Sequence, residues 1–371
     1  MSDASVYVHI PFCKSRCAYC DFTSFTSIGM ISDYTSALIR EIKKASETQS
    51  RLRVPTVFIG GGTPSLLLPE QLIQIFEALR SGFEIDENAE ITIEANPGTL
   101  SESFLKAAKD CGVNRISMGV QAWQPRLLEI LGRIHRQKEV TESADLLSKL
   151  GFDNWNADLM MGLPTQTTDE LFESIDVMKT LGAKHLSCYS LILEDGTRLF
   201  GDVRSGKYRM QTDEQDREMY RSMTEYMGKL GYHQYEISNF AYPDMECRHN
   251  LIYWRRKPYI GFGCAAASQV GNRRYKNTAS LADYISGVSA HCEEETISVR
   301  EAEKETVMLS LRLREGITDE KLLKKLAPYT KPLTDGGFME HSGKALRLTK
   351  TGMDVMDEII VRLWEGLDAI S

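Results

Sequence analysis

Residues 13–20 read Cys-Lys-Ser-Arg-Cys-Ala-Tyr-Cys, and this short stretch decides the interpretation of the whole chain. Its cysteines, Cys13, Cys17 and Cys20, have the spacing C-x-x-x-C-x-x-C, and no fourth cysteine follows closely. A fully ligated iron–sulfur cube uses four cysteines. Three thiolates on one loop can therefore hold three irons of a [4Fe-4S] cluster and leave the fourth iron free to bind another molecule.

Two other interpretations of this cysteine loop were weighed. Structural zinc requires four closed ligands, and His9 is the one candidate for the fourth, but it lies in a strand-like run before the loop. A cluster of core cysteines fits poorly, because the residues between Cys13 and Cys17 are the polar Lys-Ser-Arg. The iron–sulfur interpretation is therefore favoured.

The composition limits the class of protein. A chain of 371 residues is too long for one ordinary core, so we expect a large domain and a smaller one. The net charge of −8 argues against nucleic acid as a partner. No apolar run is long enough to span a bilayer, and residues 1–8 do not form a secretory signal, so we expect a cytoplasmic protein. The eight cysteines are then free thiols or metal ligands.

The first two thirds of the chain alternate strand-like and helical patterns. Strands are predicted at residues 6–10, 56–59, 90–94, 115–118, 154–159 and 185–190. Six βα units in a row predict an α/β fold with a parallel sheet, either open or closed into a partial barrel. In both arrangements the functional residues gather at the carboxyl ends of the strands.

The remainder of the chain predicts a second domain. We place the division after residue 240, with a core at 1–240 and a smaller, mainly helical C-terminal domain at 241–371. Residues 345–349 alternate like a short strand, and Met356, Ile360, Leu363 and Leu367 stripe a final helix. This pattern is typical of a winged-helix-like tail.

The cysteine loop and several separated motifs resemble those of the radical S-adenosylmethionine (SAM) superfamily. The resemblance covers nearly the whole chain and is closest to the oxygen-independent coproporphyrinogen III oxidase-like family. It implies a partial (β/α)6 TIM-like barrel, a [4Fe-4S] cluster and SAM bound at the open iron. In that family the reduced cluster passes an electron to SAM, which splits into methionine and a 5′-deoxyadenosyl radical.

The resemblance also implies which residues line the SAM site. The glycine-rich segment after the second predicted strand would contact the methionine part of SAM, and polar residues at later strand ends would line the rest. The residues carried over are Tyr7, Tyr19, Gly61, Gly62, Thr63, Glu94, Gln121, Arg133 and Asp158. Taken alone, a glycine triple is as often a tight turn, and Glu94 would be a solvated strand-end charge.

Two details distinguish subgroups of the family. Coproporphyrinogen oxidases carry a further cysteine two residues after the third cluster ligand, and this position is Phe22 here. The run His249-Asn250-Leu251-Ile252-Tyr253-Trp254 resembles the haem-chaperone (HemW-type) subgroup. Histidine is the usual proximal haem ligand, which makes His249 the haem-ligand candidate. Residues 247–276 contain seven lysines or arginines and no acidic residue, which suits haem propionates or, alternatively, an anionic lipid or protein surface.

These observations predict a protein that binds haem and delivers it to client haemoproteins. Homodimerisation on haem binding and peripheral contact with the inner face of the membrane are further expectations, and nucleic acid is not expected as a partner. The alternatives are oxidative decarboxylation of coproporphyrinogen III, which Phe22 puts in doubt, and another radical SAM reaction on an anionic substrate.

Overall fold

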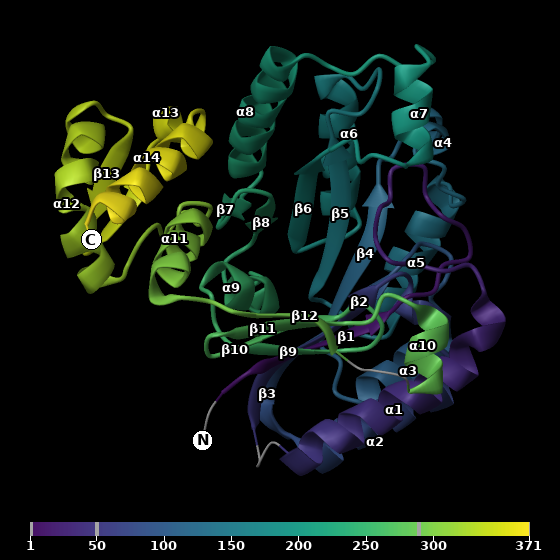
Figure 1. Ribbon diagram of the computed structural model, residues 1–371. Helices are drawn as coiled ribbons and strands as arrows, with labels where there is room; N and C mark the ends of the chain where they lie inside the picture. Colours follow the sequence, from purple (N-terminus) through teal and green to yellow (C-terminus); the bar gives the residue numbers. More distant parts are fainter. Residues whose placement is uncertain (1–2, 49–51, 288–290, 371) are drawn as a thin grey trace.

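The computed structural model describes residues 3–48, 52–287 and 291–370, and its centre is a parallel sheet (Figure 1). The six predicted strands are present and lie side by side in chain order. They are β1 (Ser5–Ile10), β2 (Arg53–Gly61), β3 (Glu84–Ala95), β4 (Arg115–Gln121), β5 (Trp155–Met161) and β6 (His185–Ser190). The predicted partial barrel is therefore confirmed.

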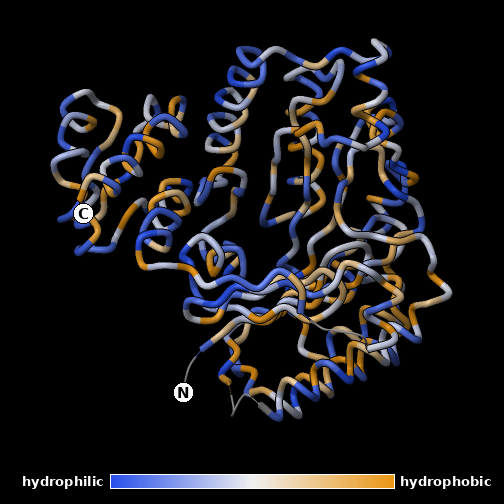
Figure 2. The backbone as a smooth tube through the Cα atoms, in the orientation of Figure 1, coloured by the Kyte–Doolittle hydropathy of each residue, from blue (hydrophilic) through white to orange (hydrophobic). Residues whose placement is uncertain are grey.

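Helices connect these strands and cover the outer face of the sheet. They are α1 (Ile31–Thr48), α2 (Pro69–Gly82), α3 (Glu102–Asp110), α4 (Pro125–Ile130), α5 (Gln137–Lys149) and α6 (Thr168–Thr180), with short 3-10 turns at Ile28–Met30 and Pro64–Leu66. A capping box of Thr167 and Glu170 begins α6, with the Thr167 hydroxyl accepting from the Glu170 amide. Figure 2 shows that hydrophobic and hydrophilic residues alternate along the outer helices.

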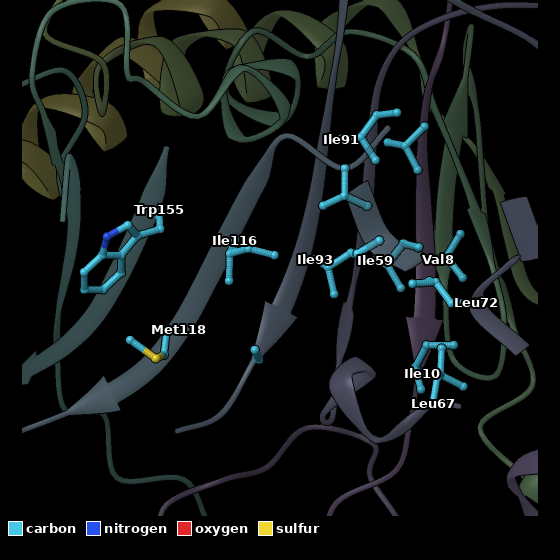
Figure 3. Close-up of a cluster of buried hydrophobic side chains, with 14 of the residues drawn as sticks. Val8, Ile10, Ile59, Leu67, Leu72, Ile91, Ile93, Ile116, Met118 and Trp155 are labelled. Carbon is cyan, nitrogen blue, oxygen red and sulfur yellow. The ribbon is translucent and has the colours of Figure 1, made fainter. Parts of the chain in front are cut away.

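The core lies between the sheet and these helices. Val8, Ile59, Ile93 and Ile116 follow one another across neighbouring strands, and none is more than 1% exposed (Figure 3). Burying each such side chain contributes roughly 1.5–3 kcal/mol. Because the apolar face of every strand is fixed in this way, the carboxyl ends of the strands are held in one rigid rim.

The sheet continues beyond the six strands on both sides. Within the described residues it has twelve strands, in the order β12-β11-β10-β9-β1-β2-β3-β4-β5-β6-β8-β7. The added strands are β7 (His233–Gln234), β8 (Asn239–Ala241), β9 (Tyr259–Phe262), β10 (Ala267–Val270), β11 (Arg273–Asn277) and β12 (His291–Thr296). Strand β9 pairs in parallel with β1, and β10 to β12 follow as antiparallel neighbours.

This extension bears on the predicted division after residue 240. Strands β9, β10, β11 and β12 belong to the barrel sheet, because β9 pairs with β1 and the other three follow it in turn. A separate hydrophobic cluster begins at Val307 and ends at Leu367. We therefore propose that the smaller domain begins near Val299 instead.

The remaining helices pack around the barrel, and the smaller domain follows them. Helix α7 (Arg198–Arg204) and α8 (Asp213–Lys229) follow β6, α9 (Arg248–Trp254) contacts β2, and α10 (Leu281–Ser286) contacts α1. The smaller domain consists of α11 (Val299–Ser310), α12 (Glu320–Asp335), the hairpin β13 (Met339–Ser342) and β14 (Ala345–Leu348), α13 (Lys350–Met353) and α14 (Met356–Ala369). None of the described helices is both long enough and apolar enough to cross a bilayer.

Candidate functional site: the rim of the barrel

The cysteine loop is tied to the barrel rim by backbone hydrogen bonds. It leaves the end of β1, and the amide of Cys13 donates to the carbonyl of Phe25 at 3.0 Å. Farther along, the amide of Ala18 donates to the carbonyl of Leu131 at 2.8 Å. These bonds hold the loop over the carboxyl ends of the strands, where the sequence predicted the site to be.

The three loop cysteines differ from the other five in exposure. Cys13, Cys17 and Cys20 are half-buried, whereas four of the others are buried and Cys292 is exposed. The Thr63 hydroxyl lies 3.7 Å from the Cys13 sulfur, and an Arg133 nitrogen lies 3.3 Å from the Cys17 sulfur. The three loop thiols are therefore partly accessible, and Cys13 and Cys17 each have a polar side chain next to the sulfur.

The chemistry of this donor set fits an iron–sulfur cluster. Burial raises the pKa of Cys13 and of Cys20, although hydrogen bonds from Thr63 and from the Phe22 backbone oppose the effect. Thiols bind metal as thiolates, so loading this loop must release protons. Within the described ranges no three His, Cys, Asp or Glu side chains are grouped tightly enough for a single ion. Three thiols on one short loop match three corners of an iron–sulfur cube, which is held by cysteine thiolates.

The glycine-rich segment that ends β2 is shaped by the cysteine loop. Gly61 has φ +112°, and a Cβ there would lie 2.4 Å from the His9 ring. A Cβ on Gly62 would lie 2.6 Å from the backbone oxygen of Phe12. Glycine is needed here to let β2 and the loop approach each other. The amide of Thr63 then donates to that same Phe12 oxygen at 2.8 Å.

Two carboxyl groups follow on the next strands. Glu94 ends β3 and accepts from the Gly61 amide at 2.9 Å; Asp158 lies on β5 and accepts from Asn156 at 2.7 Å. Burial, followed by repulsion from Asp158, raises the pKa of Glu94 to about 7. Burial also raises the pKa of Asp158. Both groups can therefore bind hydroxyl or amine groups of a polar ligand at this rim.

Arg133 and Gln121 complete the predicted polar set. One Arg133 nitrogen donates to Asn96 at 2.5 Å and to the Gly119 carbonyl, and its buried Nε has no partner among the described residues. Gln121 ends β4 with φ 70°, a conformation that non-glycine residues rarely adopt. Backbone strain and an unpaired buried donor are typical of a binding site.

The two predicted tyrosines lie on different sides of the rim. Tyr19 packs in a small apolar cluster with Leu191 and Tyr208, and its pKa is raised mainly by burial. Tyr7 lies on β1, where its hydroxyl hydrogen-bonds His9 at 2.8 Å and its ring stacks on Phe58 at 6.2 Å. The structure therefore brings most of the predicted SAM residues together, with Tyr7 at the edge of the set.

Asn96 was not among the residues predicted from the sequence. Its side-chain nitrogen donates to Thr63 at 2.8 Å and its oxygen accepts from Arg133, so it joins two predicted residues. A pocket between them is lined by Cys17, Thr63, Asn96 and Arg133, together with neighbouring loop residues. The signal was available, because Asn96 follows Glu94 at the end of the same strand.

His249, the haem-ligand candidate, lies inside the molecule and is 0% exposed. Its Nδ1 lies 2.8 Å from the Thr56 hydroxyl and its Nε2 lies 2.9 Å from the Tyr253 hydroxyl. Burial, and after it the charge of Arg115, lowers the pKa of His249 to about 3. The imidazole is therefore neutral, and it can reach a haem iron only if Tyr253 moves.

The basic stretch is largely neutralised by acidic residues from later elements. Arg255 pairs with Glu315 at 2.8 Å and Arg256 pairs with Glu305 at 2.7 Å. Arg273 and Arg274 pair with Glu294, Glu295 and Glu305. Among the described residues, Lys257 and Lys276 have no ion pair. The positive charge predicted at residues 247–276 is therefore reduced to a few sites.

Comparisons with known proteins agree with this geometry. The model of the radical SAM superfamily matches residues 7–178. The chain is 36% identical over 369 residues to "Heme chaperone HemW" of Bacillus subtilis, covering 96% of this chain and 97% of that protein. It is 39% identical over 268 residues to the protein of the same name from Escherichia coli, covering 72% and 70% of the two chains.

A solved structure supports the fold. The chain matches coproporphyrinogen III oxidase (HemN) from Escherichia coli with a TM-score of 0.84 and 22% identity, covering 98% of this chain and 90% of that one. At this identity the match concerns the fold alone, and it agrees with the partial barrel described above. The chain therefore belongs to the radical SAM superfamily and, within it, to the HemW family.

Proposed function

We propose that this protein is a haem chaperone that carries a [4Fe-4S] cluster and SAM at its barrel rim. Cys13, Cys17 and Cys20 hold the cluster, and SAM occupies its open iron. Haem is the cargo, delivered to client haemoproteins. The names of the relatives support the cargo, and the thiol loop with its polar surroundings supports the cofactors.

At the rim, each residue has a definable task toward SAM. Arg133 lies beside Cys17 and presents a cation suited to a carboxylate. Glu94 and Asp158 face the same region and can accept hydrogen bonds from hydroxyl groups. Gly61, Gly62 and Thr63 supply a backbone edge near Cys13. A reduced cluster, when bound, supplies the electron that cleaves SAM; the protein contributes orientation and exclusion of water.

The observation that carries the proposal is that the rim and the His249 helix share one wall of the barrel. The His249 ring stacks on Phe58 at 5.2 Å, and Phe58 stacks in turn on Tyr7 at 6.2 Å. Tyr7 is two residues from His9, which packs against Gly61. The haem-ligand candidate and the cluster loop are thus connected through a few packed rings in one molecule.

We further propose that client proteins meet the haem-loaded form directly, and that haem binding drives homodimerisation. A peripheral membrane contact would use the basic stretch, but four of its five arginines are paired with acidic residues and leave little free charge for lipid. Light scattering with and without haem tests the dimer, and flotation with anionic vesicles tests the membrane contact.

Coproporphyrinogen III decarboxylation is the weaker candidate. Phe22 stands where those oxidases carry a further cysteine, and its side chain is 66% exposed. An anaerobic assay with reductant, SAM and coproporphyrinogen III is expected to give no product. SAM cleavage stimulated by a non-porphyrin anion, and not by haem, would instead indicate another radical SAM reaction.

Haem titration of anaerobically purified protein tests the proposal. The wild type should bind one haem with a shifted Soret band at micromolar concentration, and His249→Ala should lose the axial-ligand signature. His341→Ala, at an exposed histidine on β13, serves as the matched control and should behave as the wild type. The absence of haem binding by the wild type would contradict the proposal.

A further inference from the structure

A second hollow, separate from the pocket beside Cys17, lies between the cysteine loop and the added strands. It has a volume of about 420 Å³, and its walls include Phe22 and Asp21 from the loop, Tyr253 from α9, Tyr259 from β9 and Lys276 from β11. This volume lies in the range of small-molecule sites, which are commonly lined by aromatic side chains with a few polar groups.

The aromatic walls of this hollow form one surface. Tyr253 and Tyr259 meet edge to face at 4.7 Å, and Tyr7 contributes to the same wall. Phe22 also lines the hollow, and 66% of its surface is exposed. A large aromatic side chain left in solvent at the rim of a hollow is a common mark of a ligand surface. A flat, apolar ligand would cover both Phe22 and the tyrosine wall.

Lys276 gives the hollow its positive charge. Of the seven basic residues at 247–276, four arginines are paired with acids and Arg248 donates to the Asn88 carbonyl at 2.8 Å. Lys276 has no ion pair within the part of the chain that the structure describes, and it lines the hollow. Asp21 lies on the loop wall, so a carboxylate of the ligand is favoured on the β11 side. The predicted match between the basic stretch and propionates is thereby narrowed to one lysine.

Tyr253 separates the hollow from His249. Its hydroxyl is hydrogen-bonded to Nε2 at 2.9 Å, and its ring meets the imidazole edge to face at 5.0 Å. The Thr56 hydroxyl donates to Ser5 at 2.7 Å, so it accepts from Nδ1 of His249, 2.8 Å away. The proton of the neutral ring is then on Nδ1, and the lone pair of Nε2 points at Tyr253. That lone pair is what a haem iron requires, and Thr56 fixes the tautomer from behind.

We propose that this hollow is the docking site for haem: Phe22 and the tyrosine wall hold the macrocycle, Lys276 pairs with a propionate, and Tyr253 turns aside to give the iron Nε2 of His249. The assignment rests on the proposed function. It adds the location of the haem, the residue that binds its propionate (Lys276) and the side chain that must move (Tyr253).

Haem affinity of four variants tests the assignment. Lys276→Glu should weaken binding about tenfold or more, because an attractive pair becomes a repulsive one. Phe22→Ala should weaken it several-fold through lost stacking. Lys257→Glu is the matched control, since Lys257 is the other unpaired lysine and lies outside the hollow; it should bind as the wild type. Tyr253→Phe, which lacks the hydroxyl bonded to Nε2, should bind haem faster and reach the same final spectrum.

Haem dimethyl ester, which lacks free propionates, provides an independent probe. The wild type should bind the ester about as weakly as Lys276→Glu binds haem, and Lys276→Glu should not weaken ester binding further. Iron content and the urea midpoint of each variant confirm that the cluster and the fold are retained.

The outcomes separate the two proposals. If Lys276→Glu and Phe22→Ala bind haem as the wild type does, while His249→Ala loses the axial ligand, the docking site is wrong and the proposed function stands. If the wild type itself binds no haem, both are wrong. The docking site is supported if Lys276→Glu weakens haem binding and Lys257→Glu does not, and if Lys276→Glu leaves binding of the dimethyl ester unchanged.

Discussion

The cysteine loop and the His249 helix are both functional candidates, yet they are built in opposite ways. The loop is held open at the barrel rim, with half-buried thiols, a strained Gln121 and an unpaired Arg133 Nε beside it. The helix α9 is closed, with both ring nitrogens of His249 hydrogen-bonded. The first site is therefore preorganised for its ligand, whereas the second must exchange an internal hydrogen bond for an external one.

The largest expected effect concerns the open site. Replacing Cys13, Cys17 or Cys20 by Ala should abolish a cluster of about four irons per chain, because each thiolate holds one corner. Iron and sulfide analysis after anaerobic reconstitution measures this. Cys111→Ala, at a buried cysteine of the core, should keep its iron. Full iron content in any of the three loop variants would contradict the assignment.

The burial of His249 in the closed site should make the free energy of unfolding depend on pH. Folded His249 has a pKa of about 3 against an ordinary 6.5, so between these values only the unfolded chain takes up the proton. Stability is therefore lost as the pH falls, by about 2 kcal/mol for this group between pH 6.5 and 4.5. The free energy of unfolding, measured with urea, should fall by that amount less in His249→Gln than in the wild type when the pH is lowered from 6.5 to 4.5. An equal loss of stability in the two proteins would mean that His249 is not buried in its neutral form.

Glu94, at the open rim, should give a pH dependence of stability of the opposite sign. Its folded pKa of about 7 exceeds the ordinary 4.5, so the folded protein keeps a proton that the unfolded chain releases. This contribution to stability is present at low pH and is lost as the pH rises, by about 2 kcal/mol between pH 5.5 and 7. Unfolding of Glu94→Gln over this range should lack that loss. The exposed Glu87→Gln is the control, and equal behaviour of the two variants would refute the prediction.

The smallest effect concerns the support of the closed site. The buried Glu90 carboxylate accepts from the amides of Arg248 and His249, both at 2.9 Å, at the start of α9. Glu90→Gln removes a charge that suits a helix N-terminus and should lower the free energy of unfolding by about 1 kcal/mol. Urea midpoints measure this against Glu84→Gln, at an exposed residue. A stability equal to that of the wild type would show that Glu90 does not hold α9 in place.

Prediction from the sequence succeeded where local patterns decide the structure. The predicted strand at residues 6–10 is β1, and the residues at strand ends do gather on one rim. It failed where distant segments decide. Strand β9 pairs with β1 across more than 250 positions, a pairing that no local pattern indicates, and it is the reason we propose a division near Val299 in place of residue 240. Likewise, nothing near Arg255 or Arg256 indicates that Glu315 and Glu305 neutralise them.

The burial of His249 was beyond the sequence analysis for the same reason. The H-N-x-x-Y-W run was found, but its histidine is fixed by Thr56, 193 positions away. Tyr253, four residues on along α9, occupies the other ring nitrogen. A motif thus identifies the ligand candidate, and only the tertiary structure shows that the candidate is closed off.

Mössbauer spectroscopy of iron-57-reconstituted protein, with and without SAM, tests the central claim most directly. The account predicts a [4Fe-4S] cluster in which SAM changes the signal of one iron while the other three, held by Cys13, Cys17 and Cys20, keep theirs. A cluster whose irons all ignore SAM, or a protein that takes up zinc in place of iron and sulfide, would contradict it.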